Sequence, residues 1–191
     1  MKKKMLIPLV LTILAAILLS SCEANKKDAP KDENIVEYNN FIFNYTGIHW
    51  VTEWRNGNNV YQVPLRFNPL QTENVTITGE KWIPTKEIFI TFDPESEGLQ
   101  YTALGAGELS NNLVTALGIT PIAACSKNIT NACKERPIIT CEQNESLAIY
   151  LVQDVPTQIT YTETCIKVQG AGMDLLKSID RLLYSWYNIQ P

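Results

Sequence analysis

The stretch that decides the fold is EIFITFDPESEG, at residues 87–98. Residues 87–92 form an apolar, β-favouring run, as expected of a central strand. Asp93 as N-cap, Pro94 at the first helical position and the acids that follow predict that a helix begins here. We expect this helix to end at Gly118, because glycine suits a left-handed C-cap.

Both predicted helices have an apolar face at helical spacing. The second is expected over residues 172–187. Gly105 and Gly107 in the first helix are expected to permit close contact with a sheet, because they have no side chain. The predicted faces comprise Leu99, Ala103, Ala106, Leu113, Val114 and Leu117 in the first helix, and Leu175, Leu176, Ile179, Leu182, Leu183 and Trp186 in the second.

Short β-favouring runs surround these helices. Residues 119–124 predict the strand that completes a β-α-β unit. Further strands are predicted over residues 138–141, 147–152 and 165–169. The turn 170–172, Gly-Ala-Gly, is expected to be a tight strand-to-helix connection rather than a phosphate-binding loop, because the third glycine of a dinucleotide fingerprint is missing.

The first half of the domain predicts an antiparallel meander. Residues 41–45 form one strand, and residues 48–54 and 60–67 flank Asn56-Gly57, a strong hairpin signal. Residues 74–78 add a short strand. The predicted fold class is therefore α+β (α/β): an N-terminal antiparallel β-meander followed by a β-α-β-β-β-α unit, with two helices packed on a sheet.

The N-terminus has the three parts of an export signal: Lys2-Lys3-Lys4, an apolar run over residues 5–19, and small residues before Cys22. Fifteen residues fall short of the roughly 20 that span a bilayer. The end, LSSC at residues 19–22, resembles the lipobox of prokaryotic lipoproteins. This resemblance implies cleavage after residue 21 and lipid on Cys22, which would tether the protein to the cell membrane, facing the extracytoplasmic side. The alternative is an ordinary signal peptide or uncleaved anchor with a chance cysteine.

Composition separates a tether from a single domain. Residues 22–36 are predicted to be a flexible tether, since EANKKDAPKDE at residues 23–33 lacks apolar periodicity. Residues 37–191 are predicted to form one extracytoplasmic α/β domain. Without the three leader lysines, the 16 basic residues become 13 against 20 acidic ones, a net charge of −7. Such a domain is a poor candidate for binding nucleic acid.

Cysteine counting supports the lipid assignment. The chain has five cysteines, and assigning Cys22 to lipid leaves four for two disulfides. Three connectivities are open, of which we favour Cys125–Cys133 and Cys141–Cys165. The first would close a polar loop, and the second would tie a strand end to a later strand. Spacings without a C-x2-C pair, together with a single histidine, argue against a structural metal site.

Four Asn-x-Ser/Thr sequons are candidate glycosylation sites in an exported chain: Asn44, Asn74, Asn128 and Asn144. The pattern is short, and the sequence leaves open whether any of them is modified.

The sequence assigns no catalytic residue and no cofactor. His49, the single histidine, lacks a G-x-S-x-G nucleophile motif and is expected to be a partly buried or surface residue. Asp93, Glu95 and Glu97 form an acidic loop after a central strand, a place where ligands often bind. Helix capping explains the same acids. The aromatic side chains are expected to be core or, if exposed, a surface for sugars or a partner: Trp50, Trp54, Tyr61, Trp82 and Tyr101.

The domain also has a wider resemblance. The runs ITFDP (90–94), AAC (123–125), CKERPIITC (133–141), VQG (168–170) and DRLL (180–183) resemble exported proteins of small-genome archaea whose activity is uncharacterised. This resemblance implies an exported, disulfide-containing domain.

The functional prediction is a membrane-anchored binding or cell-envelope interaction module, with an envelope protein or a glycan as partner. One alternative is a hydrolase that uses the loop of Asp93, Glu95 and Glu97. Another is a structural envelope component. Whether the chain is an enzyme stays open at this stage.

Overall fold

The computed structural model describes residues 33–142 and 146–191, which belong to one compact unit, Glu33–Pro191. The predicted signal peptide, the lipid site Cys22 and the sequon at Asn144 lie outside the described residues. The first strand begins at Ile35, inside the segment 22–36 that the sequence assigns to the tether.

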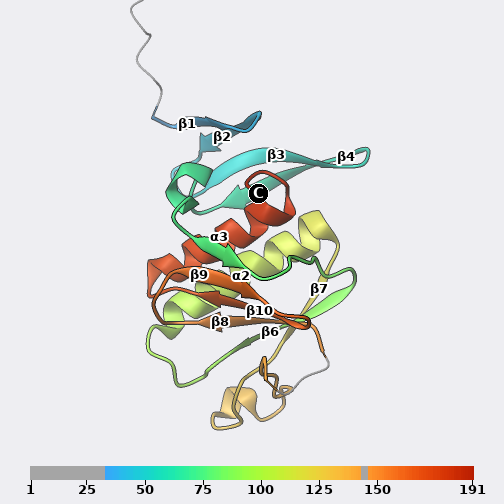
Figure 1. The fold of residues 1–191 in the computed structure, drawn as a ribbon, viewed down its shortest axis with the longest axis vertical. Coiled ribbons are helices and arrows are strands. Elements are labelled where there is room, and N and C mark those ends of the chain that lie inside the picture. The colour runs from blue at the N-terminus through green and yellow to red at the C-terminus, as the bar shows by residue number, and fades with distance from the viewer. Residues whose placement is uncertain (1–32, 143–145) are drawn as a thin grey trace, which may run out of the picture. The chain divides into compact units, whose positions relative to one another are not determined.

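An antiparallel sheet of four strands comes first in the chain (Figure 1). Its strands follow one another in sequence order as two hairpins. Asn39 and Asn40 both have positive φ angles, 46° and 68°, which makes the tight turn of the first hairpin. Gly57, with φ 59°, begins the turn of the second. The strands are β1 (Ile35–Tyr38), β2 (Phe41–Tyr45), β3 (Trp50–Asn56) and β4 (Asn59–Leu65).

A mixed sheet of six strands follows, in the order β5-β9-β10-β8-β6-β7. All neighbours are parallel except β9 and β10. A short 3-10 helix, η1 (Pro69–Thr72), joins the two sheets and is closed by a capping box between Asn68 and Gln71. The strands are β5 (Thr76–Thr78), β6 (Glu87–Phe92), β7 (Thr120–Ala123), β8 (Ala148–Val152), β9 (Gln158–Tyr161) and β10 (Cys165–Gln169).

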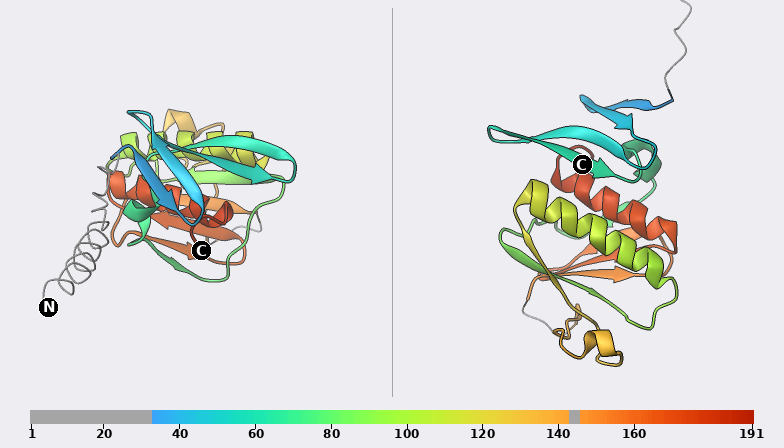
Figure 2. Two further views of the ribbon diagram at one scale, coloured as in Figure 1. Left: turned by 90° about the horizontal axis from the view of Figure 1, so that it is seen from above. Right: turned by 180° about the vertical axis from the view of Figure 1, so that it is seen from behind.

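Two helices lie side by side between the sheets (Figures 1 and 2). Helix α2 (Leu99–Asn112) continues into a π-helical turn, η2 (Leu113–Leu117), and stops at Gly118 with φ 68°, as predicted. Helix α3 (Met173–Trp186) follows β10. Its predicted apolar stripe is buried along its whole length.

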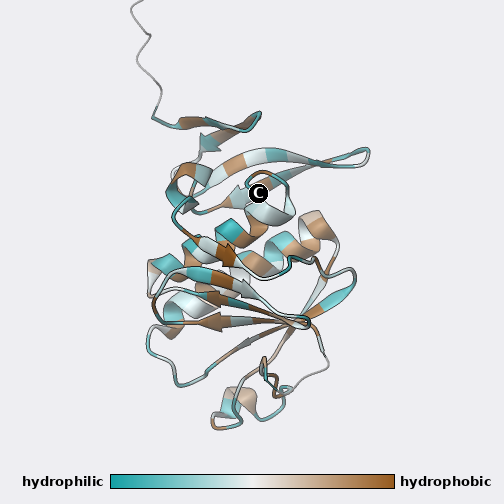
Figure 3. Ribbon diagram, in the orientation of Figure 1, coloured by the Kyte–Doolittle hydropathy of each residue, from teal (hydrophilic) through white to brown (hydrophobic). Residues whose placement is uncertain are grey.

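The helices pack on the six-stranded sheet with one face and on the four-stranded sheet with another. Phe43 of β2 meets Tyr184 of α3 edge to face at 5.7 Å between ring centroids. Asn112 of α2 donates to the carbonyl oxygen of Pro64 at 3.2 Å. Hydrophobic residues, brown in Figure 3, recur along the strands and alternate with polar residues on the helices. The helix layer therefore has two sheets to cover it, which explains why α3 is buried almost all round.

The predicted α+β fold, a meander followed by strands with two packed helices, is confirmed. Three strand assignments need correction. Residues 74–78 yield β5, which pairs with β9 in the second sheet rather than with the meander. Residues 138–141 form no strand, only an isolated bridge between Ile138 and Cys125. Residues 158–161, which the sequence analysis missed, form β9.

The start of the first helix also differs from the prediction. Asp93 does not cap α2, which begins six residues later, after Gly98 with φ 76°. The Asp93 side chain instead accepts a hydrogen bond from the backbone N–H of Glu95 at 3.0 Å, and its carbonyl accepts one from Ser96. The acids and the proline therefore build a separate turn, because a short polar side chain can satisfy a turn as readily as a helix.

The buried face of α2 is rotated from the predicted one. Leu99 and Val114 are exposed. Gly105 faces α3 rather than a sheet: a Cβ there would lie 2.4 Å from Cδ1 of Ile179. At Gly107, such a Cβ would have no atom of another described segment within 4 Å. Apart from Leu109, the residues that α2 buries are small or polar: Thr102, Gly105 and Asn112.

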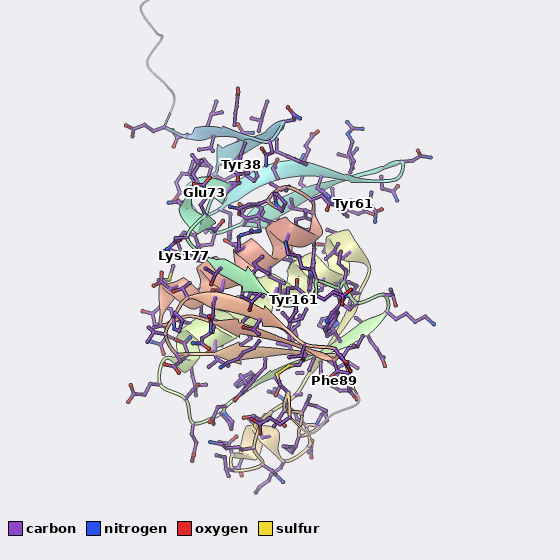
Figure 4. All side chains as sticks on the ribbon, viewed as in Figure 1. Tyr38, Tyr61, Glu73, Phe89, Tyr161 and Lys177 are labelled. Atoms are coloured by element: carbon purple, nitrogen blue, oxygen red, sulfur yellow. A yellow bond between two sulfur atoms is a disulfide. The ribbon has the colours of Figure 1, made fainter. Side chains whose placement is uncertain are left out.

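A disulfide-bonded segment covers part of the other face of the six-stranded sheet. Cys125 is bonded to Cys133, and Cys141 is bonded to Cys165. These are the two pairs that the sequence analysis favours. The segment includes the 3-10 turn η3 (Asn131–Cys133). Its Ile139 packs with Ala148 and with the ring of Phe89, which is labelled in Figure 4.

Candidate ligand-binding cleft

The four-stranded sheet splits between its two hairpins. Strands β2 and β3 are paired at only two positions, Asn44 with Val51 and Tyr45 with Trp50. Beyond them the strands separate, although β2 continues to Phe41 and β3 continues to Asn56. We call the space between residues 41–43 of β2 and residues 52–56 of β3 the fork.

The turn that follows α3 lies at the base of the fork. The Trp54 indole donates to the backbone carbonyl of Tyr187 at 3.0 Å, and the two rings lie 4.8 Å apart. On the other side, the Asn39 side-chain amide donates to the carbonyl of Ile189 at 3.0 Å. One short turn is therefore bonded to both hairpins. Its bulk explains why the ladder between β2 and β3 stops.

Arg181 and Gln190 hold this turn in place. The Arg181 guanidinium donates to the carbonyls of Gln190, at 2.7 Å, and Pro191, at 2.6 Å. The Gln190 side chain accepts from the Thr72 hydroxyl at 2.8 Å. All of these groups except Pro191 are buried, so each bond also spares a polar group the cost of burial without a partner.

The fork opens to a cavity of about 820 Å³, compared with about 300 Å³ for the hollow beside Tyr150. Ligand sites usually measure about 300–1,000 Å³ and combine apolar surface with a few polar groups. The aromatic and aliphatic lining comes from Phe41, Ile42, Val51, Trp54 and Tyr187. The polar lining comes from Asn40, Asn44, Thr52, Glu53, Arg55, Asn56, Gln62 and Asn188.

Backbone groups of both strands point into the fork. In an antiparallel ladder, every second residue turns its N–H and C=O toward a given neighbour. The bond from the Thr46 N–H to the His49 carbonyl, 2.9 Å, fixes which residues these are. Thr46 and His49 face each other across the two strands, and so does every second residue from them. These residues are Asn44 and Ile42 on β2, and Val51, Glu53 and Arg55 on β3.

The other side of β3 agrees with this alternation. Pro64 of β4 stands opposite Val51 and has no N–H, which suits a rung without hydrogen bonds to Val51. The next rungs of this kind on β4 lie opposite Glu53 and Arg55. The backbone polar groups of Ile42, Glu53 and Arg55 therefore have no strand partner within the described part of the chain.

The charges at the fork are few and exposed. Glu53 accepts a hydrogen bond from the Gln62 amide at 3.1 Å. The side chain of Arg55, two residues further along the same strand face, makes no hydrogen bond or ion pair with a described residue. The cleft thus offers one carboxylate, one guanidinium and several amides, a set that suits hydrogen-bonded recognition better than acid–base chemistry.

The acidic loop does not form a cluster. Lys127 pairs with Asp93 at 2.6 Å, and this hydrogen bond lowers the pKa of the Asp93 carboxyl. Glu95 contributes its backbone N–H to Asp93 rather than its carboxylate. Within residues 33–142 and 146–191, no group of three or more His, Cys, Asp or Glu side chains is placed to hold a metal ion.

His49 is half-buried, as expected, and lies beside helix α2. Its Nε2 is 3.4 Å from Glu108, which also accepts hydrogen bonds from Arg66. The side-chain hydrogen bond from Arg66 to Glu108 raises the pKa of the guanidinium. The three groups join the four-stranded sheet to α2, a structural connection that the sequence did not reveal.

The aromatic residues divide between core and cleft. Trp50 is buried, and Trp82 is half-buried with its indole donating to Thr162 at 2.6 Å. Trp54 is half-buried between Tyr61 and Tyr187, and it lines the fork. Figure 4 marks Tyr61 on β4 and Tyr38 on β1, the two outer strands of this sheet.

The Gly170–Gly172 turn is a close packing point. A Cβ at Gly170 would lie 2.4 Å from the backbone of Asp174 and Leu175 at the start of α3. Gly172 has φ 59° and donates its N–H to the Gln153 side chain at 2.8 Å. Glycine is needed at these two positions because a side chain would clash or strain the backbone, as expected of a tight strand-to-helix connection.

The sequons occupy different surroundings. Asn74 and Asn128 are exposed away from the fork, whereas exposed Asn44 lies on its rim. A glycan on Asn44 would stand at the mouth of the cleft, so glycosylation and ligand binding would compete for this surface.

Asp180 is a buried charge that the sequence analysis missed. It lies on the apolar helix α3, is 2 % exposed, and accepts the backbone N–H of Phe67 at 2.7 Å. Burial raises the pKa of its carboxyl well above the ordinary value. A signal was present, because Asp180-Arg181 interrupts the leucine stripe, but the sequence does not identify the partners.

Among the described residues, no helix combines the length and the apolar character needed to cross a membrane. Comparison of the chain with protein-family models, with curated proteins and with solved structures finds no match. The functional conclusion therefore depends on the geometry of the fork and on the sequence.

Proposed function

We propose that this chain is an exported lipoprotein, held at the cell membrane by lipid on Cys22, whose domain binds an envelope ligand in the fork. The observation that carries the binding proposal is the open cavity of about 820 Å³ between β2 and β3. It combines an aromatic floor, exposed amides and backbone groups that have no strand partner among the described residues. An envelope protein or a glycan is the expected class of partner.

The fork favours binding over catalysis. Its two ionisable side chains of opposite charge, Glu53 and Arg55, are both exposed, so water weakens any effect on reacting groups. The alternative of a hydrolase based on Asp93, Glu95 and Glu97 gains no support from the geometry, since Lys127 already engages Asp93. A purely structural role predicts that no ligand enters the fork.

The anchor is tested by fractionating cells that express the wild-type chain or Cys22→Ser. Lipid on one cysteine predicts that the wild type stays in the membrane fraction and that the variant does not. Mass spectrometry of the wild type should find an acylated Cys22 as the first residue. A wild-type chain that begins at Met1 with an unmodified Cys22 would disprove the anchor.

The binding role is tested by purifying the full chain from native envelopes and identifying bound molecules by mass spectrometry. A charge reversal in the fork, Glu53→Lys with Arg55→Glu, should lose the ligand. Glu73→Lys is the matched control, because Glu73 is exposed and does not line the cavity (Figure 4). Equal recovery of the ligand by all three proteins would contradict binding in the fork.

A further inference from the structure

We infer that the fork binds an extended peptide segment of another protein, which adds to β3 as a new strand. This inference rests on the proposed binding function and specifies its ligand. The backbone of β3, rather than the size of the cavity, points to a peptide.

Strand β3 is an open edge on the side of the fork. Val51 uses its N–H and C=O to pair with Asn44, and the next residues that point the same way, Glu53 and Arg55, have no paired strand among the described residues. An extended peptide would satisfy these four backbone groups in the manner of strand addition. A sugar has no regular row of donors and acceptors at this spacing.

The opposite side of the fork is a strand edge too. Ile42 directs its N–H and C=O across the gap, and Asn40 and Asn188 place exposed side-chain amides beside it. Natural proteins cover open edges or shorten them, because exposed edges pair with other chains. Here two edges face one cavity, with the indole of Trp54 as its floor.

The charges predict the peptide's sequence. Glu53 and Arg55 lie on one face of β3 at the two-residue spacing of a strand, so residues opposite them lie on one face of the peptide. A peptide that runs antiparallel to β3 would have an acidic residue opposite Arg55 and, two residues later, a basic residue opposite Glu53. The expected motif is therefore acidic-x-basic within an extended segment.

The test uses the full lipidated chain in phospholipid nanodiscs and a displayed library of random heptapeptides. Peptides with the acidic-x-basic motif should be enriched. In synthetic versions, N-methylation should weaken binding about fivefold at alternate residues and little at the residues between them, because one backbone hydrogen bond is worth about 1 kcal/mol. This scan requires no change to the protein.

A pair of proline variants tests the same edge from the protein's side. Arg55 of β3 and Val60 of β4 stand opposite each other. Arg55→Pro removes an N–H that points into the fork, while Val60→Pro removes an N–H that points away from β3, at the outer edge of β4. Peptide binding should fall about fivefold more for Arg55→Pro than for Arg55→Ala, and Val60→Pro should bind like the wild type.

Several outcomes would overturn the inference. Methylation at alternate residues without effect would exclude strand addition. If deletion of residues 23–32 makes the fork amides exchange faster with solvent, the chain's own tether fills the fork instead of a partner. A third outcome is that no peptide is enriched, whereas the protein binds to an oligosaccharide array and Glu53→Lys abolishes that binding. In that case the proposed function stands and the peptide inference fails. Failure of both probes would contradict the proposed function as well.

Discussion

The indole N–H of Trp54 donates to the backbone carbonyl of Tyr187, 3.0 Å away, and joins the four-stranded sheet to the turn after α3. Because both rings also pack at 4.8 Å, this contact fixes how far β3 stands from the end of the chain. The shape of the fork therefore depends on residues more than 130 positions apart.

Trp54→Phe should destabilise the domain by about 1–3 kcal/mol, because it leaves the Tyr187 carbonyl without its donor while keeping a ring in place. The free energy of unfolding in urea measures this. Tyr61→Phe is the control, since Tyr61 contacts the same indole but its hydroxyl makes no hydrogen bond to a described residue. Equal stability of the two variants would show that the hydrogen bond contributes nothing.

Gly105→Ala should cost about 1–3 kcal/mol, because its methyl group would overlap Cδ1 of Ile179. Gly107→Ala, in the same helix but with open space around it, should instead stabilise by about 0.5–1 kcal/mol. Adding Ile179→Val to Gly105→Ala removes the overlapping atom and should recover part of the loss. Thermal unfolding of the wild type, these three variants and Ile179→Val alone measures these effects. A double variant that is worse than the sum of its single changes would contradict the close contact.

Asp180 predicts a pH dependence of stability. Burial raises the pKa of its carboxyl in the folded state well above the ordinary value, so the folded protein holds this proton more tightly than the unfolded chain does. Below the ordinary pKa of 3.8 both states are protonated. As the pH rises from there to the folded-state pKa, stability should fall by about 1.4 kcal/mol per pH unit.

Asp180→Asn removes this loss, since an amide oxygen can still accept the Phe67 N–H and does not ionise. Urea unfolding over a pH series should show the variant gaining stability relative to the wild type as the pH rises. Parallel pH profiles of the two proteins would exclude a raised pKa at Asp180.

The two disulfides should differ in their contribution to stability. The Cys141–Cys165 bond closes a loop of sequence separation 24, and the Cys125–Cys133 bond closes one of separation 8. On the chain-entropy model, replacing both cysteines of the longer loop by serine should cost about 1 kcal/mol more than replacing those of the shorter loop. Unfolding of the paired variants tests this, and the reverse order would show that local packing outweighs loop entropy.

Much of the fold follows from local pattern. The run 87–92 and the leucine stripe of α3 are long and regular, and the structure places them as a central strand and a buried helix. The presence of disulfides is confirmed as well. Where a pattern has two physical explanations, the prediction failed: Asp93-Pro94 suits a helix start and a turn equally, and only the packing around Gly98 decides.

The fork was beyond the reach of sequence analysis. The aromatic residues of β3 indicated either core or an exposed surface, and Trp54 turned out to serve both packing and cleft. The end of the β2–β3 ladder depends on the turn after α3, which is distant in sequence. No local signal at Glu53 or Arg55 predicts that their backbone groups lack a strand partner within residues 33–142 and 146–191.

Amide hydrogen exchange along β3, measured by NMR on the ligand-free chain, tests the open fork most directly. We expect exchange rates to alternate: the amides of Glu53 and Arg55 exchange fast, while those of Thr52 and Trp54, which face β4, exchange slowly. Slow exchange at all four positions would rule out an open fork, because it would mean that the edge of β3 is already paired.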